Sequence, residues 1–107
     1  ASFGGMESLE EVELAFNLIT ALPESIGEVS TLEVLNLNEN ELKSIPESIG
    51  KLVNLTDLIL SANRLALLPE SITDIPYVTL ELETNEFDEK VKKKFLKKMP
   101  KGATYNF

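Results

Sequence analysis

Apolar and polar residues recur along the chain with a period of 23 positions, and each of the first three copies places leucines, an asparagine and a proline at the same points. Within a copy, apolar and polar residues alternate over a short segment, which is the period-2 pattern of a strand with one buried face. The predicted strands are Glu11–Ala15, Val34–Asn38 and Asp57–Ser61. A fourth copy, running from Tyr77 to Phe87, arrives one residue early, so we expect a deletion between Ile75 and Leu80.

A proline followed by Glu-Ser-Ile opens the return path of the first three copies. Because proline fixes φ and cannot donate a hydrogen bond, these segments are expected to be irregular or to form one helical turn. Their serines are expected to bond local backbone groups. The isoleucines predicted to fill the core from this side are Ile26, Ile49 and Ile72. A single short strand cannot bury its apolar face alone, so the copies must stack, and each buried Leu or Ile then contributes roughly 1.5–3 kcal/mol.

An asparagine stands at the end of each predicted strand. The four residues are Asn17, Asn40, Asn63 and Asn85. A side-chain amide both donates and accepts hydrogen bonds, so it can pair with backbone groups where the chain turns out of the sheet. We therefore expect these residues to form a buried structural ladder and not a ligand site, since buried polar groups must be paired.

The pattern LxxLxLxxNxLxxLPxxI, which spans residues 9–87, resembles the leucine-rich repeat family. The Pro-Glu-Ser-Ile-Gly form at Pro23–Gly27 and Pro46–Gly50 is similar to the 23-residue intracellular repeats typified by plant Ras-group-related and Ras-scaffold proteins, and to bacterial repeats. The resemblance implies an α/β fold, a right-handed solenoid of about four repeats with short parallel strands on the concave face.

Residues 88–107 have the features of a C-terminal capping helix followed by a terminal extended segment. Asp88 is a candidate N-cap, and Val91, Phe95 and Met99 form an apolar stripe that can cover the last repeat. A solenoid exposes apolar cross-sections at its ends and needs such caps. An alternative is that this lysine-rich helix binds a membrane surface or a calmodulin-like partner.

The N-terminal end shows no comparable cap. Residues 1–8 form a tail or partial cap, and residues 1–5 are a candidate cloning remnant. An uncovered first repeat would expose an apolar edge. Two interpretations stay open: the chain is a fragment of a longer repeat protein, or this end is a surface for self-association.

Charge is distributed unevenly along the 107 residues, whose net charge is −8. Residues 1–89 hold all 18 acidic side chains and only three basic ones, Lys43, Lys51 and Arg64, whereas residues 90–107 hold seven lysines. Binding to nucleic acid needs clustered Lys and Arg, so the acidic body argues against it and favours a basic partner.

Composition narrows the chemistry further. The chain has no Cys and no His, which excludes disulfides, thiolate sites and imidazole chemistry. No apolar run is long enough to cross a membrane, and this chain shows no signal peptide. The absence of Cys weakly favours the cytoplasm, with a secreted bacterial protein as the alternative. Asn54-Leu55-Thr56 fits the glycosylation sequon, which we interpret as coincidence.

The outward-facing strand positions and the turns after them form the candidate binding surface. Its residues are Glu11, Glu13, Phe16, Val34, Asn36, Asn38, Glu39, Asp57, Ile59, Ser61, Glu81 and Glu83. Phe16, Val34 and Ile59 are apolar at positions predicted to face solvent, so they are candidate anchors within an acidic rim.

These features predict a protein–protein interaction module that binds its partner on an acidic concave face. The alternative is a structural or recognition fragment of a larger effector or signalling scaffold, with the function carried elsewhere. Glu81 and Glu83 are the best candidates for carboxylate chemistry, but they lie on an open face. Their oxygens would suit Ca²⁺ better than Zn²⁺, since the chain has no His or Cys, but the sequence holds no EF-hand-type ligand loop. It also has no phosphate-binding glycine motif. We therefore expect no enzyme activity, no cofactor and no metal site.

Overall fold

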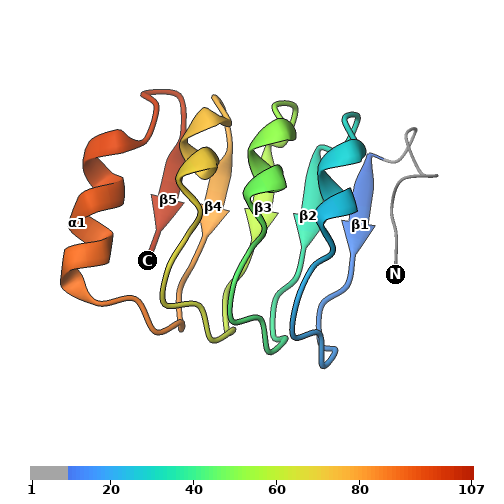
Figure 1. Cartoon of the computed structure of the whole chain (residues 1–107), viewed down its shortest axis with the longest axis horizontal. Helices are drawn as coiled ribbons and strands as arrows, with labels where there is room; N and C mark the ends of the chain where they lie inside the picture. The colour runs from blue at the N-terminus through green and yellow to red at the C-terminus, as the bar shows by residue number, and fades with distance from the viewer. Residues whose placement is uncertain (1–9) are drawn as a thin grey trace.

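The computed structural model describes residues 10–107, which form one parallel five-stranded sheet in the order β1-β2-β3-β4-β5. Each strand lies beside the next one in the sequence, so the chain winds through successive similar turns (Figure 1). The strands are β1 (Glu11–Glu13), β2 (Val34–Asn36), β3 (Asp57–Ile59), β4 (Thr79–Glu81) and β5 (Thr104–Asn106). The predicted α/β solenoid with parallel strands is confirmed.

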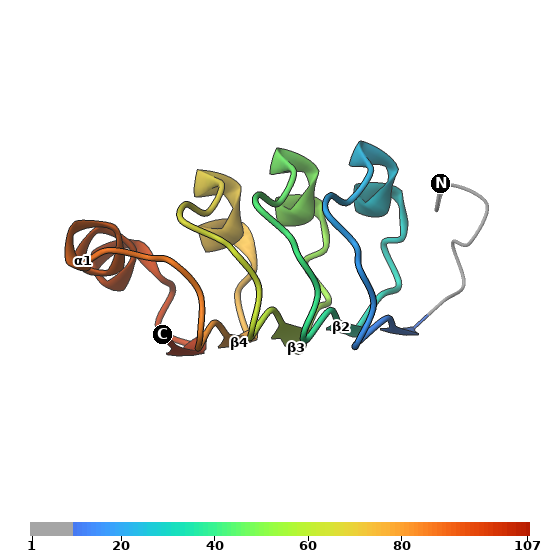
Figure 2. The same ribbon diagram turned by 90° about the horizontal axis from the view of Figure 1, so that it is seen from below.

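Short 3₁₀ helices return the chain from one strand to the next. They are η1 (Glu24–Glu28), η2 (Glu47–Lys51) and η3 (Glu70–Asp74), and a proline precedes each one. The carbonyl oxygen of Pro46 accepts a hydrogen bond from the Ile49 N–H at 3.1 Å, which closes the turn. Figure 2 shows the strands along one side of the molecule and these helices fanned out along the other, so the sheet occupies the inner side of the curve.

The core lies between the sheet and the 3₁₀ helices and repeats the same contacts at each level. Leu35 and Leu58 are fully buried at the centres of β2 and β3, while Ile49 and Leu52 close the core from the opposite side. The predicted isoleucines on the return path are all fully buried: Ile26, Ile49 and Ile72. A period-2 strand therefore supplies one wall of the core and the proline-led turn supplies the other.

The fourth copy shows where the one-residue deletion falls. Tyr77, with which the fourth copy begins in the sequence pattern, is 72% exposed, whereas Val78 is fully buried. Glu33 and Val34 both donate their N–H to the Glu10 carbonyl, but at the fourth level only Thr79 donates to the preceding copy at this point. The missing residue thus lies between Val78 and β4, and the first core residue of the fourth copy is Val78 and not Tyr77.

Serine side chains join successive 3₁₀ helices. The Ser48 hydroxyl donates to the Glu24 carbonyl at 2.7 Å, and the Ser71 hydroxyl donates to the Glu47 carbonyl at 2.6 Å. These bonds reach the preceding turn 24 residues away, so the prediction that Ser48 and Ser71 bond local backbone was wrong.

Three of the strand-end asparagines tie neighbouring copies together. The Asn63 amide donates to the Leu37 and Leu60 carbonyls, both at 3.0 Å, and accepts the Leu42 N–H at 3.0 Å. Asn40 and Asn85 make equivalent bonds at their own levels. Asn17 is exposed and bonds the nearby Leu14 and Ala15 carbonyls, so the expectation that it is buried was wrong.

Helix α1 (Glu89–Lys98) follows β4 and leads into β5. The Asp88 side chain accepts the Val91 N–H at 2.9 Å, which confirms the predicted N-cap. Phe95 is buried, and Val91 and Met99 are partly buried against the core. The terminal segment pairs Tyr105 with Leu80 across the sheet.

The helix also contacts η3 through charge. The Glu70 carboxylate lies 3.1 Å from the Lys94 Nζ and 3.3 Å from the Lys98 Nζ. Their hydrogen bonds and positive charge hold the pKa of Glu70 below its ordinary value. The predictions made for residues 1–8, and for Leu9, lie outside the described residues.

Candidate functional site

The inner face of the sheet presents two rows of outward side chains, one at the start and one at the end of each strand. Strand register sets both rows. The first row is Glu11, Val34, Asp57, Thr79 and Thr104, and the second row is Glu13, Asn36, Ile59, Glu81 and Asn106. Because the residue between them on β1–β4 points into the core, each three-residue strand contributes two side chains to this face.

Two apolar side chains lie near the middle of this face. Val34 and Ile59 are on adjacent strands and are diagonal neighbours, and both are partly buried. Asp57 lies opposite Val34 and two positions before Ile59 on β3. Glu81 is the register partner of Ile59 on β4. The apolar pair is therefore flanked by carboxylates on its own and neighbouring strands.

Asparagines of the second row orient two of the carboxylates. The Asn36 Nδ2 donates to Glu13 Oε2 at 2.8 Å, while its Oδ1 accepts the Asn38 N–H at 3.0 Å, which fixes the amide. The Asn106 Nδ2 donates to Glu81 Oε2 at 3.4 Å. Glu13 and Glu81 are thereby held on either side of Ile59 along the second row.

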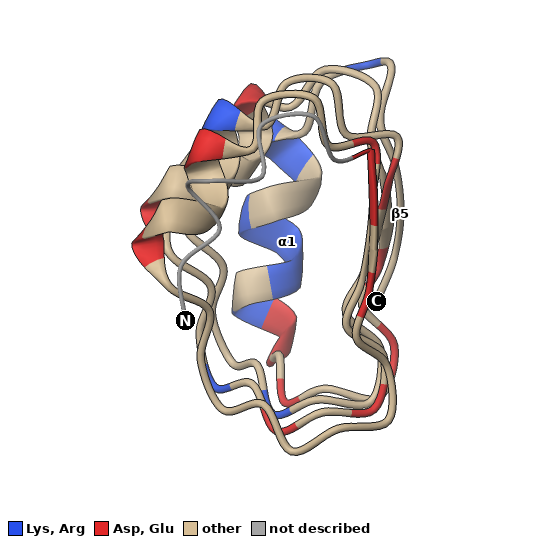
Figure 3. Cartoon of the chain, turned by 90° about the vertical axis from the view of Figure 1, so that its right-hand side faces the viewer, with Lys and Arg blue, Asp and Glu red and all other residues tan. Residues whose placement is uncertain are grey.

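This face is negatively charged, and no Lys or Arg within residues 10–107 forms an ion pair with its carboxylates. Figure 3 shows acidic residues along the strands and the lysines gathered on α1. Partly exposed carboxylates without a cation attract basic groups from solution, most strongly at low salt.

The turns just after β1–β4 contain a backbone feature that the sequence did not reveal. Four residues at the same point of successive copies have φ between 54° and 60°: Phe16, Glu39, Ala62 and Thr84. This left-handed region is unfavourable for residues other than Gly, Asn and Asp. No glycine marks these positions, so only their equivalent spacing could have indicated them. At Phe16 the turn leaves the ring 73% exposed beside the sheet.

The remaining candidate residues lie between the rows and these turns. The carbonyls of Asn38, Ser61 and Glu83 accept the N–H groups of the left-handed residues one copy earlier, at 2.9–3.0 Å. Asn38 and Ser61 are partly buried, whereas Glu39 and Glu83 are exposed. The structure thus brings the candidate residues from the first four strands onto one face, with Phe16 and Glu39 at its edge.

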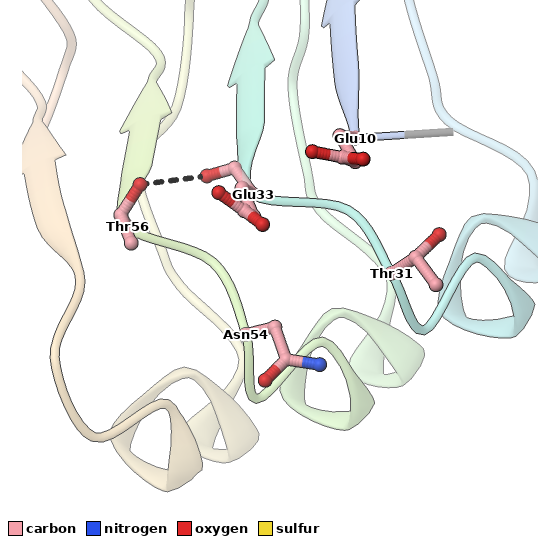
Figure 4. Close-up of a pocket in the computed structure, with 5 residues that line it drawn as sticks. All are labelled: Glu10, Thr31, Glu33, Asn54 and Thr56. Atoms are coloured by element: carbon pink, nitrogen blue, oxygen red, sulfur yellow. Dashed lines mark hydrogen bonds between the residues drawn. The ribbon is translucent and has the colours of Figure 1, made fainter. Parts of the chain in front are cut away.

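Besides the inner face, the structure has a polar hollow at the start of the strands, which the sequence did not predict. It is an open depression of about 520 Å³, lined by Glu10, Thr31, Glu33, Asn54 and Thr56 (Figure 4). The Thr56 hydroxyl donates to the Glu33 carbonyl at 3.2 Å, and the Asn54 amide donates to the Ser30 carbonyl at 2.9 Å. The Thr56 hydroxyl also lies 3.3 Å from the Asp57 Oδ2, so a carboxylate of the inner face borders this hollow.

Residues 10–107 contain no cluster of three or more side chains suited to a metal ion. No helix in the described part of the chain has the length and apolarity needed to span a membrane.

Comparison with known proteins places this geometry in context. The family model described as leucine rich repeat matches residues 7–65. A solved leucine-rich repeat protein of Leptospira interrogans is similar to the chain, with 36% sequence identity and a TM-score of 0.88. The match covers 92% of this chain but 25% of the Leptospira chain, so the present chain spans about a quarter of that protein's length. No curated protein matches the sequence.

Proposed function

The chain belongs to the leucine-rich repeat family, and from that premise we propose that it binds a basic protein partner on the inner face of its sheet. Leucine-rich repeat domains are generally protein-interaction modules. The partner-binding residues we propose are the two rows and the adjoining turn positions, with Phe16, Val34 and Ile59 as apolar anchors. The single observation that carries the proposal is the apolar pair Val34 and Ile59 among carboxylates that have no cation.

Energetics support this choice of face. An apolar side chain that is fully desolvated by a partner can contribute 2 kcal/mol or more at the centre of an interface, whereas rim contacts contribute little (roughly below 1 kcal/mol). Ile59 is already partly buried by its neighbours, so a partner needs to cover only the rest of the side chain. The carboxylates around it would speed association with a basic partner at low salt.

We further propose that residues 9–87 form four leucine-rich repeats of the Pro-xx-Ile-Gly type and that residues 88–107 cap them. Burial of Phe95, partial burial of Val91 and Met99, and the pairing of β5 with β4 support this role for the C-terminal segment. In this arrangement Lys94 and Lys98 of α1 stabilise the cap through Glu70.

The proposed function is non-catalytic. The carboxylates of Glu81 and Glu83 stand on an open strand face, and general acid–base chemistry needs environments that separate two pKa values. The described residues hold no such enclosed pair. A catalytic segment elsewhere in a longer parent protein is compatible with this proposal.

A comparative pull-down with mass spectrometry tests the proposed function. The wild-type chain is compared with Phe16→Ala and Ile59→Thr variants, and with Glu47→Gln on η2 as a control outside the inner face. We expect one or more proteins to be captured by the wild type and the control, but lost with Ile59→Thr and reduced at high salt. Capture that is indifferent to both inner-face substitutions would contradict the proposal.

A second candidate function is recognition or structural support within a longer solenoid. The observation that favours it is the fourfold greater length of the Leptospira chain. Reading the parent gene would test this candidate, which requires additional 23-residue copies beyond the present sequence.

A further inference from the structure

The inner face has a width and a length that suit the binding of a single α-helix. Its strands are three residues long, which gives a width of roughly 10 Å at 3.3 Å per residue. That width matches the diameter of an α-helix with its side chains, about 10–12 Å. Across the strands, four intervals of about 4.8 Å give roughly 19 Å, the length of about 13 helical residues.

The two carboxylates of the second row, Glu13 and Glu81, lie at different distances from Ile59 in the direction across the strands. Ile59 lies on β3, Glu81 lies one strand away on β4, and Glu13 lies two strands away on β1. At about 4.8 Å per strand, the carboxylates are roughly 5 Å from Ile59 on one side and 10 Å on the other. A helix covers these distances in about three and seven residues.

Residues three and seven positions from a central residue, on opposite sides, share one face of an α-helix. A helix lying across the strands could therefore rest an aliphatic residue on Ile59 and direct one cation to Glu81 and another to Glu13. Both carboxylates are oriented by asparagines and are free of internal ion pairs among residues 10–107. A strand-like partner has its side chains at a period of two and does not fit this spacing.

On these grounds the geometry points to a basic amphipathic helix as the occupant of the inner face. This inference rests on the proposed function, that a basic partner binds there. Its recognition pattern is a Lys or Arg three residues from an aliphatic anchor on one side and a second Lys or Arg seven residues away on the other. The acidic rows give this helix its charge complementarity, and the Val34–Ile59 pair gives it an apolar contact. Either chain direction satisfies the spacing, so the two directions are separate arms of the test.

Synthetic helical peptides provide the test, with the full chain as the protein. One peptide carries Lys-x₆-Leu-x₂-Lys, and a second carries the reversed spacing. Two peptides serve as controls. The first has the same composition, but its distant lysine is five residues from the leucine and so lies on the opposite helix face. The second has a central proline that breaks the helix. Binding is measured by calorimetry or fluorescence anisotropy at low and moderate salt.

Protein variants locate the bound peptide. We expect Glu81→Gln and Glu13→Gln to weaken a correctly spaced peptide by about two- to fivefold each, as for a partly exposed ion pair. Ile59→Thr should weaken it by about fivefold or more, as for a central interface residue. Glu47→Gln on η2 should leave the affinity unchanged. A peptide with Glu in place of the lysine three residues from the leucine should regain affinity for a Glu81→Lys variant.

The outcomes separate this inference from the proposed function. Equal binding of the correctly and wrongly spaced peptides would overturn the helix register, and so would tight binding of the proline control. The proposed function would still stand if the captured partner remained sensitive to Ile59→Thr. Conversely, a correctly spaced peptide that binds without sensitivity to Ile59, Glu13 or Glu81 would overturn the inference, because the helix would then lie elsewhere.

Discussion

Gly50 and Ser71 approach so closely that a methyl group on Gly50 would lie 2.5 Å from the Ser71 Cβ and 2.5 Å from its carbonyl oxygen. The close approach lets η2 and η3 stack and lets the Ser71 hydroxyl donate to the Glu47 carbonyl. The same relationship joins Gly27 to Ser48 one copy earlier. Glycine is therefore required here by the spacing between turns.

The first prediction concerns this spacing. Gly50→Ala should lower the free energy of unfolding by about 1–3 kcal/mol, the usual cost of overpacking a tight contact. Urea unfolding followed by circular dichroism measures it. Thr73 stands at the point of η3 that Gly50 occupies in η2. Because η3 is the last 3₁₀ helix within residues 10–107, no further one packs against Thr73, and Thr73→Ala serves as a matched control. That control should lose only the bond to the Glu70 carbonyl, about 1 kcal/mol or less. Equal losses for the two variants would refute the explanation.

The second prediction compares two asparagines that look alike in the sequence. Asn63→Ala should cost at least about 2 kcal/mol, because it leaves the buried Leu42 N–H without its acceptor. It also removes one of the two amide bonds to each of the Leu37 and Leu60 carbonyls, which keep their bonds to Asn40 and Asn85. Asn17→Ala should cost about 1 kcal/mol or less, since that residue is exposed and bonds only its own turn. Denaturant midpoints at constant m-value measure both. A reversed order would contradict the roles assigned to the two side chains.

The third prediction follows from the left-handed turns. Ala62 has φ of 57°, a conformation that costs roughly 1–2 kcal/mol for a residue with a Cβ. Replacing it with glycine removes this strain but adds about 0.4–1 kcal/mol of unfolded-state entropy. Ala62→Gly should therefore stabilise the chain by about 0.5–1 kcal/mol as the difference between these effects. Ala66→Gly, at an exposed position with negative φ, should destabilise it, and thermal unfolding distinguishes the two signs.

The fourth prediction is a pH dependence that arises from Glu70. Lys94 and Lys98 lower its folded-state pKa below the ordinary value of 4.5. The resulting stabilisation is present above pH 4.5 and is lost as the pH falls through the lower folded-state pKa. Carboxyl carbon NMR should show the Glu70 pKa rising toward its ordinary value in the double variant Lys94→Ala with Lys98→Ala.

Lys93→Ala gives the control for that titration. Lys93 is exposed and takes part in none of the ion pairs found in residues 10–107. Its removal should change the Glu70 pKa much less than removal of Lys94 and Lys98. An unchanged Glu70 titration in the double variant would show that the contact between α1 and η3 does not form in solution.

The repeated hydrophobic pattern was enough to predict the main elements of the fold. A period of two around Leu35 and Leu58, recurring every 23 residues, can be satisfied only by stacked strands with those leucines inside. The position of the deletion was harder to infer, because Tyr77 and Val78 are both apolar and adjacent. Backbone pairing decides between them, since only Val78 reaches the core.

Contacts between successive copies were largely beyond prediction. Sequence alone does not give the distance between neighbouring 3₁₀ helices, so the reach of Ser48 and Ser71 to the preceding turn was missed. The left-handed turns were missed because Phe16 and Ala62 are not residues that favour positive φ. Alignment of the copies did place Val34 and Ile59 on the outward face, but the amide that holds Glu13 depends on a side-chain conformation that no pattern specifies.

The central claim, that the inner face of the sheet binds the partner, is tested most directly by site-specific photo-crosslinking. A photoreactive residue at Asn36, between Glu13 and Ile59 in the second row, is compared with one at Glu28 at the end of η1 on the opposite side of the molecule. A crosslinked partner formed from position 36 and absent from position 28 is the predicted result. A partner crosslinked only from position 28 would contradict the claim.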